Sequence, residues 1–297
     1  MTGLTKRVKS VYRAAAVCGC LAGCDPVTYV PPAIHYAAVQ SDFRPHSKKG
    51  PTGRISGRVT WTGVIPGIPP YRAAKGVGGI PVSHDVPNPF IPRVDSATHG
   101  LANTVAFLRH MDSDRAGPWP YPPVTFEMTS DRLTMNGARV GFVPVGGEVR
   151  FESKAATPQM IRGRGAAFFS FALPDPDRPR IRTFDRPGRV ELSSGAGQFW
   201  AQADLFVCEH PYYGVTNDRG EFELPNVPPG RYELVVWHRS WWPVRQERDP
   251  DTGMVARMTF ADPVETVQSV TVEPGQTVVA NATFGLSSFP VPQPATK

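Results

Sequence analysis

The sequence has little cysteine. Cys18, Cys20 and Cys24 lie within the first 24 residues, which leaves Cys208 as the only thiol in the rest of the chain. One thiol cannot form an intramolecular disulfide, so the body must be held by packing and strand pairing. The apolar run at 14–23 is about half of the ~20 residues that a membrane-spanning helix needs.

Helical periodicity is also missing, since no stretch sustains it over twelve residues. Proline is frequent instead, with 33 of 297 residues, and there are 28 Gly. Both residues interrupt helices and favour short strands joined by turns. With 40% hydrophobic and 20% charged residues the chain can still build a packed core. We therefore predict an all-β protein.

The sequence also lacks a cluster of basic residues and the common catalytic motifs. Four of the 32 Lys and Arg and none of the 26 Asp and Glu lie in residues 1–23, so the remainder carries 28 against 26, a net charge of +2. This near neutrality argues against nucleic-acid binding. There is no G-x-S-x-G elbow, P-loop or dinucleotide glycine pattern, although composition alone leaves a Ser/His/Asp triad open. We predict no enzyme activity and no cofactor.

The N-terminus has the pattern of an export signal. A basic stretch at 1–13 precedes the short apolar run, and Leu21-Ala22-Gly23-Cys24 resembles the lipobox of bacterial lipoproteins. The resemblance implies that 1–23 is a cleaved signal peptide and that Cys24 is lipidated. Residues 24–52, rich in Pro, are then a tether. The expected location is periplasmic or extracytoplasmic, anchored to a membrane through lipid; a plain cleaved signal is the alternative.

The body is a series of alternating strands. Ile55–Trp61 alternates apolar and polar residues, and a loop of about 40 residues is expected after it. Further strands are predicted at the following ranges: 101–108, 124–128, 148–152, 166–173, 188–192, 199–207, 267–272 and 277–284. Turns at Asn217-Asp218-Arg219-Gly220 and Pro228-Pro229-Gly230 separate three strands between 212 and 237.

A family resemblance rests on these last strands. Residues 215–234, Val-Thr-Asn-Asp-Arg-Gly-Glu-Phe-Glu-Leu-Pro-Asn-Val-Pro-Pro-Gly-Arg-Tyr-Glu-Leu, and Ile55-Ser-Gly-Arg-Val59 resemble carboxypeptidase-regulatory-like domains. His210-Pro-Tyr-Tyr-Gly-Val-Thr216 with Val236-Trp-His238 resembles exported bacterial proteins of a plastocyanin-like, methylamine-utilisation-like group. The resemblance implies a transthyretin-like β-sandwich (53–117 and 208–290) interrupted by a cupredoxin-like sandwich (118–207), with a disordered tail at 291–297.

The copper site implied by this resemblance is degenerate. A blue-copper centre needs two His, a Cys thiolate and a weak axial ligand such as Met. Alignment with the group places Gln159 and Gln198 at the His positions, Gly195 at the Cys position and Ala201 at the Met position. Because residues 111–207 contain neither His nor Cys, shifting the alignment cannot supply the ligands. We therefore expect no metal in the insert.

Other candidate sites are weaker. The arginines between 178 and 189 could face an anionic partner or form a solvated loop face. Cys208 and His210 share a strand face and could contact a metal, although a strand-end His before Pro is the simpler interpretation. An aromatic group could pack in the core, cap the sandwich, form a protein interface or bind a glycan. Its members are Trp237, Trp241, Trp242, Tyr212 and Tyr213.

Together these patterns favour a non-catalytic, membrane-anchored binding protein. The expected partner is an envelope or membrane protein, with this chain as an accessory subunit of the complex. A copper-binding electron carrier and a carbohydrate-binding module are the alternatives from other classes.

Overall fold

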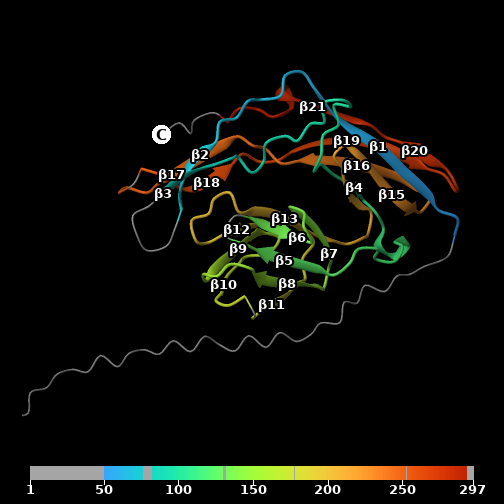
Figure 1. Ribbon diagram of the computed structural model, residues 1–297. Helices are drawn as coiled ribbons and strands as arrows, with labels where there is room; N and C mark the ends of the chain where they lie inside the picture. The colour runs from blue at the N-terminus through green and yellow to red at the C-terminus, as the bar shows by residue number, and fades with distance from the viewer. Residues whose placement is uncertain (1–49, 76–81, 130–131, 177, 252, 293–297) are drawn as a thin grey trace, which may run out of the picture. The chain divides into compact units, whose positions relative to one another are not determined.

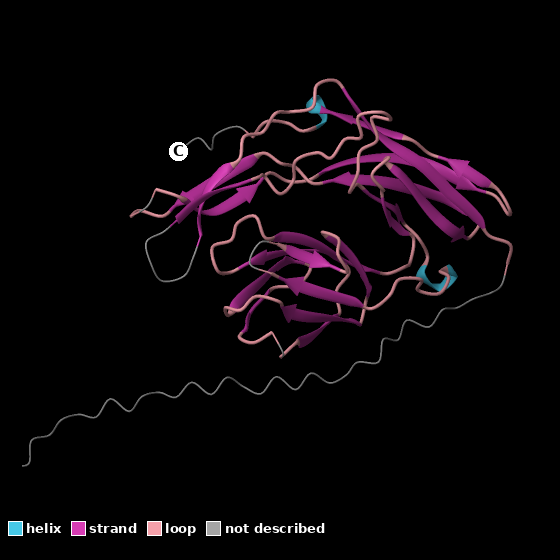
Figure 2. Ribbon diagram, in the orientation of Figure 1, coloured by secondary structure: helices cyan, strands magenta, loops and turns pink. Residues whose placement is uncertain are grey.

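A computed structural model describes residues 50–75, 82–129, 132–176, 178–251 and 253–292. The predicted signal peptide, Cys24, nearly all of the tether and most of the predicted tail lie outside the described residues. The described residues are nearly all β, with 54% strand and 3% helix, which confirms the predicted all-β sandwich class (Figure 2). No helix in this part of the chain has the length and hydropathy of a membrane span.

Two four-stranded sheets combine strands from both ends of the described chain (Figure 1). One has the order β15-β1-β20, with β21 also paired to β1, and the other has the order β14-β4-β16-β19. Both sheets contribute to one hydrophobic core, which we call the outer core. The strands are β1 (Gly53–Thr62), β4 (Val105–Arg109), β14 (Tyr213–Val215), β15 (Glu221–Val227), β16 (Gly230–His238), β19 (Val264–Val272), β20 (Thr277–Val279) and β21 (Ala282–Gly285).

The strands between β4 and β14 form two further sheets and a second core, the insert core. Their orders are β10-β9-β12-β13-β7 and β11-β8-β5-β6. Burial alternates along β8, which is the pattern of a strand with one face in a core. The strands are β5 (Val124–Met128), β6 (Leu133–Met135), β7 (Val140–Pro144), β8 (Gly147–Ser153), β9 (Gln159–Gly165), β10 (Phe169–Leu173), β11 (Arg180–Phe184), β12 (Gly188–Ser194) and β13 (Gln202–Cys208). Single 3-10 turns occur at η1 (Ser113–Arg115) and η2 (Leu286–Ser288).

Strand β13 is buried at all seven positions. Ala203, Leu205 and Val207 belong to the insert core. Phe206 and Cys208, on the alternate face, belong to a third cluster that also contains Trp237 of β16. β13 therefore lies between two packed layers, and even its polar residues Gln202 and Asp204 are buried.

Two hairpins were not predicted from the sequence, and one of them lies in the predicted loop. The 40-residue loop expected after β1 contains β2 (Tyr71–Lys75) paired with β3 (Val82–Val86), and β17 (Pro243–Arg248) pairs with β18 (Val255–Phe260). The expected loop was wrong because these strands bury few residues of their own. Ala73, Val86 and Met258 pack into the insert core, so their order depends on a distant part of the chain.

Four predicted strands are also divided or shortened. The strand expected at 199–207 begins only at Gln202, as β13. The strand expected at 166–173 is the turn between β9 and β10 followed by β10 itself. The strand expected at 277–284 is split into β20 and β21, where the Ala280 N–H donates to the carbonyl of Ser56. Strand β4 starts only at Val105, because Asn103 has a positive φ of 60°.

Candidate functional site

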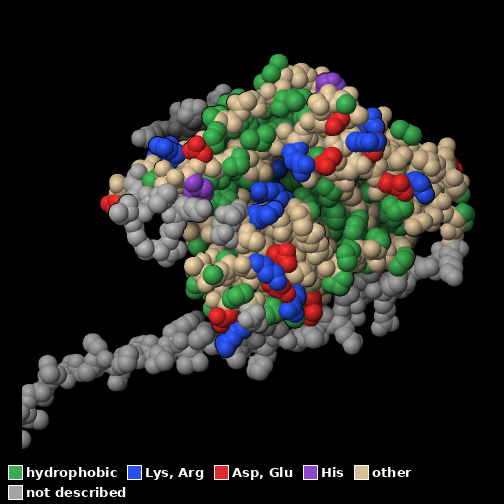
Figure 3. Space-filling view, viewed as in Figure 1, with side chains coloured by type: hydrophobic (Ala, Val, Ile, Leu, Met, Phe, Trp, Pro, Cys, Tyr) green, Lys and Arg blue, Asp and Glu red, His purple; other side chains and the backbone are tan. Residues whose placement is uncertain are grey.

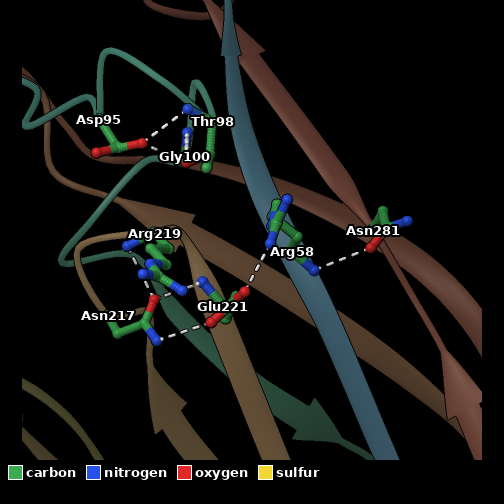
Figure 4. A network of polar contacts seen from close by, with 8 residues as sticks. All are labelled: Arg58, Asp95, Thr98, Gly100, Asn217, Arg219, Glu221 and Asn281. Carbon is green, nitrogen blue, oxygen red and sulfur yellow. Dashed lines mark hydrogen bonds and ion pairs between the residues drawn. The ribbon is translucent and has the colours of Figure 1, made fainter.

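The Asn217-Asp-Arg-Gly-Glu221 turn is a packing element of the outer sandwich (Figure 4). Asn217 Oδ1 accepts the backbone N–H of Arg219 and of Glu221, both at 2.9 Å. Its Nδ2 donates to Glu221, whose other carboxylate oxygen accepts from Arg58 of β1 at 2.6 Å. These two hydrogen bonds, from Asn217 first and then from Arg58, lower the pKa of Glu221. The polar residues of the signature thus hold a turn against β1.

Gly100 shows how closely this turn is packed. A Cβ at Gly100 would lie 2.0 Å from the carbonyl oxygen of Arg219. The neighbouring turn is fixed by Asp95, which accepts from the backbone N–H and the hydroxyl of Thr98 at 2.7 and 2.6 Å (Figure 4). No other residue type fits at Gly100 without displacing the backbone.

The aromatic group is mostly interior. Trp241 is fully buried, with Phe289 at 4.3 Å and Trp61 at 5.8 Å between ring centroids. Trp242 is half-buried and donates from Nε1 to the carbonyl of Phe289. Trp237 is also buried, between the two sandwiches.

The two tyrosines of this group are tied into the same structure. Tyr212 is buried and donates to the carbonyl of Asn226 at 3.1 Å, while Tyr213 is half-buried in the cluster around Trp237. The interface and glycan interpretations therefore do not fit Trp237, Trp241 and Tyr212, because a ring must be exposed to stack on a partner. Their burial is that of core and cap residues.

The four degenerate copper positions lie at one end of the insert. The Gly195 N–H donates to the carbonyl of Met160 at 2.7 Å, so the loop after β12 lies against the start of β9. Gln159 and Ala201 are buried, and Gln198 accepts from the Ser194 hydroxyl at 2.7 Å. A Cβ at Gly195 would meet the Met160 side chain at 2.6 Å, which means that Met160 fills the space of a side chain there.

These residues do not fit a copper ion, since an amide, a glycine and an alanine supply no imidazole or thiolate. Throughout the described ranges, no three His, Cys, Asp or Glu side chains are grouped as metal ligands would be.

Cys208 and His210 are each engaged with neighbouring groups. Cys208 Sγ donates to the carbonyl of Phe206, and His210 Nδ1 accepts the N–H of Tyr212 at 3.3 Å. Burial lowers the pKa of His210 to about 4 and raises the pKa of the Cys208 thiol. The imidazole of His210 is therefore neutral and the thiol of Cys208 is protonated. Both states are typical of buried structural residues and not of a reactive thiol.

An aromatic cluster joins the insert to the outer sandwich. Phe206 of β13 meets Trp237 of β16 edge-on at 5.3 Å, and Phe142 of β7 lies 5.6 Å from Tyr213 of β14. Tyr213 also stacks on Phe107 of β4 at 5.0 Å. Each such pair contributes about 0.5–1.5 kcal/mol beyond the apolar area that it buries. We call this contact region the junction.

A buried charge network lies in the junction beside these rings. Asp204 of β13 accepts from Arg239, just after β16, at 2.8 Å and from Arg189 of β12 at 3.0 Å. Arg239 also donates to Gln202 at 2.8 Å and pairs with Glu191 at 3.4 Å. Burial raises the pKa of Asp204, although the two guanidinium groups oppose this shift.

The Arg239 guanidinium is held on its other side by an aromatic ring. Its Cζ lies 4.3 Å from the centroid of the Phe90 ring, a cation–π contact. Its Nε is buried and has no hydrogen-bond partner among the described residues. Arg239 therefore keeps an unused donor in spite of its ion pairs.

A hollow of about 290 Å³ opens beside this network. Residues of both sandwiches line it, with Asp204 as the only carboxylate in the lining and with four arginines: Arg93, Arg132, Arg139 and Arg239. In the space-filling view, Lys and Arg side chains border a hollow near the middle of the face drawn (Figure 3).

Arg139 is half-buried and has no acidic partner among the described residues. Its Nη1 donates to the carbonyls of Trp200 and Gln202 at 3.3 and 3.1 Å. Burial lowers its pKa, and the positive charges of Arg132 and Arg239 lower it further. The hollow thus concentrates positive charge.

The Arg-rich segment 178–189 does not form one anion-facing surface. Arg182 lies over Phe169 at 4.5 Å, Arg178 pairs with Asp175 and Arg189 enters the junction. The arginines that converge are those lining the hollow, and sequence analysis missed them. They come from separate segments with no shared motif, so the sequence gives no signal for them.

No family model matches this sequence, and no curated protein is similar enough to count as a match.

Proposed function

We propose that the chain is a non-catalytic, extracytoplasmic binding protein, anchored to a membrane through lipid on Cys24, that serves as an accessory subunit of an envelope complex. The proposal rests on one observation, which is that the buried ionisable groups make structural contacts. Asp204 and Arg239 join the two sandwiches, and His210 and Cys208 are bonded to backbone groups. The side-chain types that enzymes use for catalysis are thus engaged in structural contacts in this chain.

The junction supports a binding role in a second way. It fixes two sandwiches side by side through rings and ion pairs, so a partner meets one continuous surface rather than two hinged modules. Association then costs less ordering of the free protein. A copper carrier is not proposed, because the insert holds no copper ligand set.

Two experiments test the proposal. The anchor is tested with the full chain and a Cys24→Ser variant expressed with a bacterial export system. We expect only the full chain in the membrane fraction, with a mass increase that corresponds to acyl groups on the cleaved N-terminus. Equal membrane association of Cys24→Ser would refute the anchor.

Binding is tested by photo-crosslinking in intact membranes of the source bacterium. A photoreactive residue is placed at exposed positions of each sandwich, such as Val267 and Ile181. We expect one membrane or envelope protein to be captured repeatedly from neighbouring positions, with Cys24→Ser as the control that loses it. A full scan of exposed positions without a reproducible adduct would refute the accessory role.

A further inference from the structure

We propose that the hollow beside Arg239 is a binding site for a small dianionic ligand that carries a phosphate or carboxylate groups. The site requires neither the lipid anchor nor the complex.

The charge balance leaves two guanidinium groups without an acid. Asp204 and Glu191 match Arg189 and Arg239, and Arg93 pairs with Asp218 at 3.0 Å. Among the described residues, Arg132 and Arg139 have no carboxylate within ion-pair distance (the nearest acceptors of Arg139 are backbone carbonyls). Arginine stays protonated at any physiological pH, so two positive charges that face the hollow have no carboxylate partner among the described residues.

Two of the guanidinium groups that line the hollow are held in place by the fold. Arg139 is fixed by its two carbonyl acceptors, and Arg239 is fixed between Asp204 and the Phe90 ring. Both positive neighbours lower the pKa of Arg139 in addition to burial, which shows that the charges repel one another. An anion between them would remove this repulsion and give the remaining guanidinium N–H groups an acceptor.

The size of the hollow limits the ligand. At about 290 Å³ it is at the lower end of the range for small-molecule sites. Its lining also includes Trp237, Phe90 and Ile91, so apolar surface is present beside the arginines. This combination suits inorganic phosphate, a phosphorylated small molecule or a small di- or tricarboxylate, and the two uncompensated charges favour a dianion over a monoanion.

The test is calorimetric titration of the purified full chain in detergent at constant ionic strength, because salt would otherwise screen the interaction. The probes are inorganic phosphate, glycerol 3-phosphate, citrate and acetate. We expect saturable 1:1 binding of at least one multivalent probe below about 10 mM, and acetate to bind at least about tenfold more weakly. A preference between phosphate, glycerol 3-phosphate and citrate then identifies the ligand class.

Arg132→Gln removes one uncompensated charge from an exposed side chain and leaves the junction intact. We expect it to weaken the preferred probe about tenfold or more. Ala138→Glu introduces a carboxylate at an exposed turn residue that lines the hollow, and we expect it to abolish binding. Arg178→Gln makes the same change of charge on an exposed arginine outside the lining, and we expect unchanged affinity.

The proposal is overturned if no probe binds saturably, or if Arg132→Gln and Ala138→Glu bind like the wild type while near-ultraviolet circular dichroism shows them folded. These outcomes leave membrane attachment and crosslinking untouched, so failure of the anion site and failure of the proposed function are distinguishable.

Discussion

Two buried histidines predict a loss of stability in mild acid. His238, at the end of β16, contacts the carbonyl of Arg239 through Nδ1 at 2.7 Å, so this nitrogen carries the proton and donates. His210 instead accepts the Tyr212 N–H through Nδ1. Burial lowers the pKa of both imidazoles to about 4 from about 6.5 in the unfolded chain. The folded protein therefore keeps both rings neutral.

The change in the free energy of unfolding with pH is set by the difference in proton binding between the folded and the unfolded chain. Above pH 6.5 both states hold neutral imidazoles and the histidines do not affect the free energy of unfolding. As the pH falls below 6.5 the unfolded chain binds protons that the folded chain rejects, so stability is lost progressively until about pH 4. With folded and unfolded pKa values of about 4 and 6.5, each histidine costs about 2 kcal/mol at pH 5 and about 3 kcal/mol at pH 4.

The assay is urea unfolding followed by tryptophan fluorescence at pH 8 and pH 5. Matched variants are His210→Asn and His238→Asn, because the Asn side chain can accept or donate at the place of Nδ1 without titrating. We expect the double variant to lose about 4 kcal/mol less than the wild type between these pH values. Carboxylates titrate in both proteins and cancel in the difference. Equal losses in the two proteins would refute the assignment of neutral, buried imidazoles.

Three further outcomes are expected. Asp204→Asn leaves the buried Arg239 guanidinium with only the more distant Glu191 carboxylate, and we expect it to lower the free energy of unfolding by roughly 3–5 kcal/mol in the same urea assay. Gly100→Ala forces the turn beside it to move, and we expect a loss of about 1–3 kcal/mol, whereas Gly67→Ala, with nothing within 4 Å of its Cβ, should change stability little. Cys208, fully buried and with a raised pKa, should react with a thiol reagent only after unfolding; labelling of the native protein at the rate of a free thiol would contradict this.

The sequence predicts strands well where one face meets a core and the other meets water. Strand β1 is such a case, since Ile55, Val59 and Trp61 alternate with less buried residues. Strand β17 shows the opposite case, because none of its residues is buried and its order comes from pairing with β18. A strand that is ordered by pairing alone has no buried face and therefore no hydrophobic periodicity, so the sequence does not indicate it.

The candidate site could not be predicted for a related reason. Arg132 directly precedes β6 and Arg139 directly precedes β7, while Arg239 follows β16 about a hundred residues later. Only the packing of β13 against the outer sandwich brings them to one hollow. The sequence did indicate arginine-rich chemistry, but at 178–189, where alternation along β11 and pairing with neighbours separate the side chains. A high density of arginines in one segment of the sequence therefore did not indicate which arginines lie together in the folded protein.

The two halves of the junction contribute to stability in different ways, and this difference favours a ligand. The aromatic half buries apolar rings and stabilises the contact directly. The charged half must remove Asp204 and Arg239 from water, and apolar residues of similar volume often join surfaces as well or better. Arg132 and Arg139 add further positive charge there, and the charge of Arg132 lowers the pKa of Arg139 in addition to burial. The stability of the fold therefore does not explain why Arg132 and Arg139 line the hollow. An anion bound between them would interact favourably with both guanidinium groups and offset their repulsion. Hence Ala138→Glu, which supplies a tethered carboxylate, should raise the free energy of unfolding as it abolishes anion binding.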